Sequence, residues 1–157
     1  MRVLKHSIKG MINLDVAFNK CFVLADLGCG TGTNTLLVAS IIIDIVLDLC
    51  KEYKKAPQFQ ENRETFGSCF VSAFPGSFYG RLFPDESLHL INASYAVHWL
   101  SQVPEGIENN NANIYMAKTS PPNVFEAYGK QFHVDFLKFL HLRSMEIICG
   151  GSMILSF

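Results

Sequence analysis

Residues 22–34 of the chain read FVLADLGCGTGTN and predict the start of an α/β fold. The apolar run at residues 22–25 stops in a turn rich in glycine, which is typical of a buried strand that enters a tight turn. Residues 35–50 follow directly and predict a helix, with Asp44 and Asp48 four residues apart on its solvent face. Strand, glycine turn and helix together form the first unit of a sheet with helices packed on it.

The rest of the chain continues this pattern to its last residue. Short apolar runs at residues 69–74 and 88–93 predict two more strands, and residues 124–148 predict a long helix with an apolar residue at every fourth position. We expect the glycines at 150–151 to end that helix and residues 152–157 to begin a last strand. The predicted order β-α-β-β-α-β indicates a partly parallel sheet with helices on its faces.

Length and composition exclude several classes of protein. The chain has 157 residues, which suits one domain, and its 49% hydrophobic content and net charge of −1 exclude a disordered chain and a basic nucleic-acid binder. Its five cysteines lack zinc-type spacing, and its first residues lack the apolar core of a secretory signal, so we expect free thiols in the cytosol. The longest apolar stretch, residues 36–50, is too short to cross a bilayer.

The glycine turn indicates which kind of ligand the fold binds. Its spacing, Gly28-x-Gly30-x-Gly32, differs from the G-x-G-x-x-G of dinucleotide sites, and no lysine follows for a phosphate loop. What remains is a D-x-G-x-G-x-G pattern from Asp26, the usual first motif of methyltransferases that use S-adenosylmethionine (SAM). Glycines let the backbone approach a ligand, the next helix offers N–H groups to its carboxylate, and Asp26 can counter its cationic part. The turn by itself is equally compatible with other nucleotide binders or with a plain tight turn.

Two later stretches carry a resemblance to one family. Residues 75–84 read PGSFYGRLFP and residues 94–104 read SYAVHWLSQVP. With the glycine turn, they closely resemble the plant SABATH methyltransferases, which act on salicylate, jasmonate, benzoate, loganate and indole-acetate carboxyl groups or on nitrogens in the caffeine pathway. The resemblance covers the chain from about residue 22 to its end, with Thr33 in place of the family's proline.

What the resemblance implies is a Rossmann-like SAM-dependent methyltransferase sheet. It implies SAM as the cofactor, Mg²⁺ as a further one in some relatives, and a small carboxylic acid as the substrate. It implies no catalytic residue beyond positioning groups, since a substrate carboxylate is already ionised at neutral pH and needs no general base. The positions that match the family's SAM contacts are Asp26, Gly28, Cys29, Gly30, Asn34, Ser77, Phe78 and Ser94. The substrate positions are Tyr95, His98 and Trp99, and Asn110 matches a magnesium ligand of some relatives.

Plainer interpretations of the same residues stay open from composition alone. Phe78 and Trp99 could be core aromatics, and His98 could be an exposed histidine without a ligand. The phenylalanines of residues 125–139 are expected to form core rather than pocket. Only the motif match favours the site interpretation, in which Phe78 stacks on the purine and the Trp99 indole N–H binds a carboxylate oxygen.

Three departures from the family pattern predict an incomplete enzyme. Residues 1–20 form a poorly defined segment without the family's S-Y-A-x-N-S-like motif, and residues 21–157 form a partial SAM-binding domain. The Gln60–Glu61 junction lacks a strand bearing L-N-D-L and the helix after it, and relatives continue past Phe157 into a helical cap. We expect a gap or a re-paired edge in the sheet, poor SAM binding, and little or no activity from this chain alone.

Three functions are therefore compared. The leading hypothesis is a SAM-dependent O-methyltransferase of small acids. Jasmonate-, salicylate- or loganate-like acids are favoured over xanthines as substrates. No nucleic-acid or membrane partner is expected, and a homodimer is the assembly considered. The second is a non-catalytic product or a pairing partner of full-length relatives, which the missing L-N-D-L stretch favours. The third, a dinucleotide-dependent oxidoreductase, is disfavoured by the glycine spacing.

Overall fold

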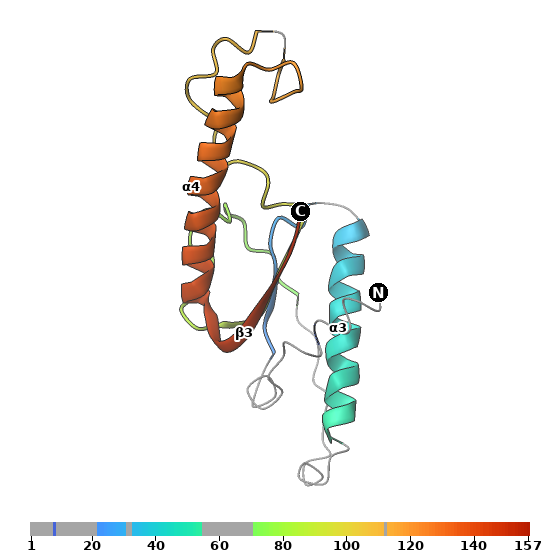
Figure 1. The fold of residues 1–157 in the computed structure, drawn as a ribbon. Helices are drawn as coiled ribbons and strands as arrows, with labels where there is room; N and C mark the ends of the chain where they lie inside the picture. The colour runs from blue at the N-terminus through green and yellow to red at the C-terminus, as the bar shows by residue number, and fades with distance from the viewer. Residues whose placement is uncertain (1–7, 9–21, 31–32, 55–70, 112) are drawn as a thin grey trace.

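The computed structural model describes residue 8 and residues 22–30, 33–54, 71–111 and 113–157 (Figure 1). Along these residues the elements are β1 (Leu24–Asp26), α3 (Thr33–Lys54), β2 (Leu88–Ser94), α4 (Pro122–Glu146) and β3 (Ile147–Ser156). The strands are parallel and lie in the order β1-β2-β3, with α3 and α4 in the two connections. The predicted α/β fold with a parallel sheet is confirmed.

A long helix covers each face of the sheet, with α3 on one side and α4 on the other (Figure 1). Ile42 and Leu49 of α3 are buried against Leu90 of β2 on the first face. Phe139 of α4 is buried against Ile91 of β2 on the second face. Successive side chains of a strand point to opposite faces, so the adjacent pair Leu90 and Ile91 serves both layers. β2 is therefore the central strand, and its continuous apolar run reflects burial on both sides.

The predicted helices are confirmed, but one predicted strand is wrong where it can be tested. Asp44 and Asp48 on α3 are both exposed, as their spacing predicts. Residues 71–74 of the expected strand at 69–74 are exposed and form no strand, while residues 69–70 lie outside the described residues. A short apolar run becomes a strand only where a sheet edge can pair with it, which a sequence window does not reveal.

The boundary between α4 and β3 also differs from the prediction. Residue Ile147, directly after α4, is already extended, and β3 begins there, so Gly150 and Gly151 lie inside the strand rather than at a helix end. Gly150 has a φ of 78°, and the pairing of β2 with β3 shifts register between Leu88 and Leu90. A Cβ on Gly151 would lie 2.6 Å from Cγ1 of Ile147. The two glycines therefore mark an irregularity in the strand.

β1 lies at the edge of the described sheet. Among the described residues it pairs with β2 alone, so its other edge has no strand partner there. The Gln60–Glu61 junction, from which a gap or a re-paired edge is expected, lies outside the described residues. Within the described part of the chain, neither helix is long and apolar enough to cross a membrane.

Candidate cofactor and substrate site

The carboxyl ends of β1 and β2 bring two of the cofactor candidates together. The strand register pairs Asp26 with Asn92, and Asn92 Nδ2 donates to Asp26 Oδ1 at 2.7 Å. The same amide nitrogen lies 3.3 Å from Ser94 Oγ, so one asparagine joins both candidates. Ligands of open parallel sheets bind outside the carboxyl ends of the strands. Asp26 and Ser94 thus lie where a nucleotide-like ligand is expected.

The burial of the Asp26 carboxyl is only partly compensated by its hydrogen bond. Burial raises the pKa of Asp26, and the hydrogen bond from Asn92 only partly opposes that rise. Asn92 is itself 2% exposed, so its amide is fixed in place. Because this partner is neutral, a cationic group of a ligand would relieve the cost by favouring the ionised carboxylate.

The glycine turn after β1 combines close packing with open space. Gly28 and Gly30 have φ values of 70° and 60°, in the left-handed region that favours glycine. A Cβ on Gly28 would lie 2.3 Å from Ala96 Cβ and 3.4 Å from Phe78 Cε1, so the turn rests against both. A Cβ on Gly30 would meet nothing within 4 Å, which leaves backbone that a ligand can approach. Cys29 between them is exposed.

This arrangement fits the adenosine and amino-acid parts of SAM in residue type. The half-buried carboxylate of Asp26, the open backbone at Gly30 and the ring of Phe78 all lie near the carboxyl end of β1. Asn34 lies in the first turn of α3, next to this edge, but its side chain and residues 31–32 lie outside the described structure.

Phe78 lies between the core and the site. Its ring is 6.1 Å from Phe139 in an edge-to-face contact and 4.7 Å from the neighbouring Tyr79, and it stays partly exposed. Ser77 is exposed, and its Oγ accepts a hydrogen bond from Tyr79 N at 3.2 Å. Phe78 is in part a core aromatic, because its ring packs against the core that contains Phe139. Its Cε1 atom lies next to Gly28, so the ring also borders the glycine turn.

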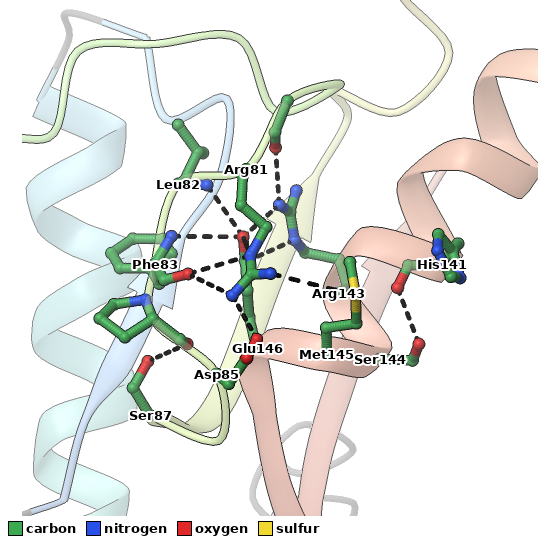
Figure 2. A network of polar contacts seen from close by, with 12 residues as sticks. Arg81, Leu82, Phe83, Asp85, Ser87, His141, Arg143, Ser144, Met145 and Glu146 are labelled. Carbon is green, nitrogen blue, oxygen red and sulfur yellow. Dashed lines mark hydrogen bonds and ion pairs between the residues drawn. The ribbon is translucent and has the colours of Figure 1, made fainter.

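A buried ion pair at the end of α4 holds the loop that carries Phe78 (Figure 2). Arg143 and Glu146 are 1% and 0% exposed, and their side chains meet at 2.8 Å. Arg143 also donates to the backbone oxygens of Phe78 and Gly80, at 2.7 Å and 2.9 Å. Glu146 Oε1 accepts from the backbone N–H of Leu82 at 2.8 Å. The pair therefore fixes this loop by its backbone, whatever its side chains contact.

The substrate candidates lie in an irregular segment directly after β2. Tyr95 has a φ of 52°, a left-handed conformation that is strained for a residue other than glycine. It is 68% exposed, Trp99 is 67% exposed, and His98 is exposed with its ring 6.3 Å from the Trp99 ring. The interpretation of Trp99 as a core aromatic is therefore wrong, because the indole projects from the fold.

An open, mostly apolar groove of about 680 Å³ lies beside this segment. Its walls come from the segment after β2, from the loop before α4 and from the first half of α4. They include His98, Val103, Met116, Phe125, Tyr128 and Phe132. The phenylalanine stripe of α4 is thus divided, since Phe125 and Phe132 line the groove while Phe139 is in the core. The expectation that the whole stripe forms core is wrong for its first half.

Comparison with known proteins identifies the family. A model of SAM-dependent carboxyl methyltransferases matches residues 1–61 and 53–157. The chain belongs to this family. Its match begins at residue 1, so the expectation that the likeness starts near residue 22 is too narrow.

Several relatives show how much of a family member this chain spans. A probable methyltransferase of Theobroma cacao is 43% identical over 190 residues, covering 99% of this chain and 51% of the relative. A benzoic acid/salicylic acid carboxyl methyltransferase of Petunia hybrida is 46% identical over 88% of this chain and 47% of the relative. The solved structure of a loganic acid methyltransferase with SAH superposes with a TM-score of 0.82 at 31% identity, covering 98% of this chain and 50% of that one. The chain thus spans about half the length of these relatives.

Asn110, which matches a magnesium ligand of some family members, has a different set of contacts here. Its Oδ1 accepts from Ser120 Oγ at 2.8 Å and from Asn113 Nδ2 at 3.3 Å, and its Nδ2 lies 3.2 Å from the oxygen of Tyr115. The part of the chain that the structure describes contains no group of three or more His, Cys, Asp or Glu that could hold a metal. This amide oxygen already accepts two hydrogen bonds within its loop, so Asn110, in the arrangement that the structure describes, does not fit as a Mg²⁺ ligand.

Several residues that support this candidate site are not identified by the sequence motifs. They are buried side chains with polar groups that hydrogen-bond to the segments around the site: Tyr79, Asn92, Asp135, Arg143 and Glu146. The sequence contains a signal for the three on α4, because positions 135, 139, 143 and 146 share one helical face with Phe139 at its centre. Charged residues at the period of a buried face are rarely placed there unless they are paired.

Proposed function

We propose that the chain forms the SAM-binding part of an enzyme that transfers a methyl group to the carboxyl group of a small-molecule acid. The observation that carries this proposal is the meeting of Asp26, Asn92 and Ser94 at the carboxyl edge of the sheet, beside a glycine turn that rests against Phe78. The family membership supports the reaction class, and the printed substrates of the relatives support the kind of acceptor.

In the proposed reaction, the chain's own residues bind and orient the two reactants. Asp26 would face the cationic part of SAM, open backbone at Gly30 would receive its polar end, and Phe78 would stack on the purine. SAM supplies a methyl group activated by a positively charged sulfur. His98 and Trp99 would orient the acid, whose carboxylate needs no general base because it is already ionised at neutral pH.

The finer parts of the proposal rest on composition and resemblance. We propose a jasmonate-, salicylate- or loganate-like carboxylic acid in preference to a xanthine, a cytoplasmic location in which the cysteines stay reduced, and a homodimer as the assembly to test. No nucleic-acid partner is proposed, since the net charge of −1 offers no basic surface. The proposal includes no step that uses Mg²⁺.

A second candidate is a non-catalytic chain that pairs with longer relatives. It is supported by the edge of β1, which has no strand partner among the described residues, since such an edge can accept a strand from another chain. Size-exclusion chromatography with and without a full-length relative separates the two candidates. Full activity of the chain alone and no complex would eliminate the second.

The proposed cofactor site is tested by calorimetric titration of SAM into the purified chain and its variants. We expect weak binding, with a dissociation constant above the micromolar range, and binding roughly tenfold weaker in Asp26→Asn because the countering charge is removed. Asp44→Asn, which removes an exposed acid from α3, is the charge-matched control and should bind as the parent does. Stronger binding of NADH than of SAM, or equal binding by both variants, would contradict the proposed site.

A further inference from the structure

The segment of residues 97–101 is held by its backbone although two of its side chains project from the fold. Val97 is 1% exposed and fixes the start of the segment, but Trp99 is 67% exposed and His98 is exposed as well. Packing therefore does not determine the direction of the indole or the imidazole. Polar contacts to the backbone of this segment must do so.

One of these contacts comes from Tyr79, in the loop that carries Phe78. Its hydroxyl lies within hydrogen-bonding distance of the backbone oxygens of Val97, at 3.2 Å, and of Trp99. Tyr79 is 7% exposed, so the hydroxyl is fixed by its surroundings. Burial raises the pKa of Tyr79, and the negative charge of Asp135 raises it further, so the phenol stays protonated and continues to donate at neutral pH.

The other contact comes from Asp135, on the buried face of α4. This residue is 3% exposed, and its carboxylate accepts from Ser101 N at 2.8 Å and from Ser101 Oγ at 2.7 Å. Gln131 Nε2 donates to the same carboxylate at 3.0 Å. A buried carboxylate is costly unless it is fully hydrogen-bonded, and here most of its partners belong to one residue of the segment.

We propose that Asp135 and Tyr79 are positioning residues for the acid-binding side of the site: they fix the backbone of residues 97–101 and thereby set the direction of His98 and Trp99. Asp135 holds the end of the segment from α4, and Tyr79 holds its middle from the Phe78 loop. The assignment of residues 97–101 to acid binding rests on the proposed function. The fixing of their backbone by Asp135 and Tyr79 can be measured without a ligand.

The test compares backbone order parameters of residues 97–101, measured by ¹⁵N NMR relaxation on the full chain without ligand. In Asp135→Ala we expect them to fall from about 0.85 to below about 0.6, and in Asp135→Asn, which keeps one acceptor, to lie between these values. Tyr79→Phe, which removes only the hydroxyl, should loosen Val97 and Trp99 more than Ser101. The two milder variants decide the question if Asp135→Ala does not fold.

The matched control is Ile42→Ala, which lowers stability on the opposite face of the sheet without touching the segment. Its order parameters at residues 97–101 should equal those of the parent under native conditions. Unchanged order parameters in Asp135→Asn and Tyr79→Phe, or an equal fall in Ile42→Ala, would overturn the inference, because the residues would then act on global stability alone.

A second measurement connects the segment to the reaction. In calorimetric titrations of the chain with benzoate as the probe acid, Asp135→Asn should raise the dissociation constant for benzoate roughly tenfold and leave that for SAM within about twofold. A rise in the dissociation constant for SAM alone would overturn the assignment to the substrate side. A chain that does not bind SAM at all would count against the proposed function, while the ligand-free order parameters would still decide the inference.

Discussion

The two faces of the sheet are built from different kinds of residue. Under α3 the buried residues are aliphatic, with Ile42, Ile45 and Leu49 packed against β2. Under α4 the buried set includes Asp135 and the pair Arg143 and Glu146 beside Phe139. Both helices bury a face, but among the side chains that the structure describes, only those of α4 include buried charged groups that contact loops.

The difference separates stabilising a fold from fixing the position of a site. Apolar burial is non-directional, and it tolerates exchange of one aliphatic side chain for another of equal volume. Buried charges need partners in defined directions, so they fix the groups that they bind. Here those groups are the backbones of two loops, the one with Phe78 and the one with Trp99.

The largest loss of stability is expected from Glu146→Ala. The variant leaves the Arg143 guanidinium buried without its carboxylate, which costs about 3–5 kcal/mol of the free energy of unfolding. The measurement is urea denaturation followed by circular dichroism. Glu126→Ala, an exposed acid on the same helix, should change the free energy by less than about 0.5 kcal/mol. Equal losses in the two variants would show that the buried ion pair adds no stability beyond that of an exposed acid.

An intermediate loss is expected from Gly28→Ala. The added Cβ would meet Ala96 at 2.3 Å in a backbone with a φ of 70°, so we expect a loss of about 2–3 kcal/mol. Gly30→Ala has a similar φ of 60° but open space around the new atom, so only the backbone strain of about 1 kcal/mol applies. Thermal unfolding of the two variants side by side isolates the packing contribution. A greater loss in Gly30→Ala would show that the turn is packed differently.

A smaller loss is expected from Ile42→Leu on the α3 face. The substitution conserves volume in an aliphatic cluster, so the free energy of unfolding should fall by less than about 1.5 kcal/mol. Glu146→Gln is equally isosteric on the α4 face but removes the charge that Arg143 needs, so it should cost more. If Ile42→Leu is the more damaging of the two, the comparison between the faces is wrong.

The smallest effect is a pH dependence at His89 of β2. Val23 N donates to His89 Nδ1 at 3.2 Å, which requires that nitrogen to be unprotonated, and burial lowers the pKa of the ring. The folded state therefore favours the neutral form. The neutral His89 ring therefore adds to the free energy of unfolding, and this addition is complete above the unfolded pKa of about 6.5. It is lost as the pH falls from there through the lower pKa of the folded state.

The expected loss at His89 stays under about 1 kcal/mol, since the ring is only partly buried and solvent screens it. His89→Asn keeps an acceptor for Val23 N without titrating, so it should flatten the dependence of the unfolding free energy between about pH 6.5 and 5. His133→Asn, at an exposed position of α4, is the control and should leave the slope unchanged. A slope that persists in His89→Asn would show that another group titrates there.

The sequence predicted the elements that follow from local pattern. The strand before the glycine turn, the helix after it and the long helix at residues 122–146 all follow from apolar periodicity and turn residues. The glycines at 150–151 do not end the helix as the pattern predicts, because a strand irregularity and a helix end can both use a glycine with positive φ, as at Gly150. Exposed residues 71–74 show that an apolar run alone does not make a strand.

The candidate site could be predicted only as far as its motifs reach. Asp26, Gly28 and Phe78 belong to recognisable stretches, and the fold brings them together. Asn92 and Asp135 belong to no such stretch, since what makes them important is a contact across 66 and 34 residues of sequence. Pairings of that kind depend on the register of the sheet and on the helix face, which become visible only in three dimensions.

The most direct test of the central claim is a ¹⁵N NMR titration of the chain with S-adenosylhomocysteine, the ligand of the solved loganic acid methyltransferase. Weak binding is sufficient for this measurement. We predict that the amide signals of Gly28, Gly30, Phe78 and Ser94 shift together with one binding constant. Those of Ile42 and Leu49, on the buried face of α3, should stay in place. Absence of shifts at the carboxyl edge up to millimolar ligand, or shifts confined to the α3 face, would contradict the proposed cofactor site.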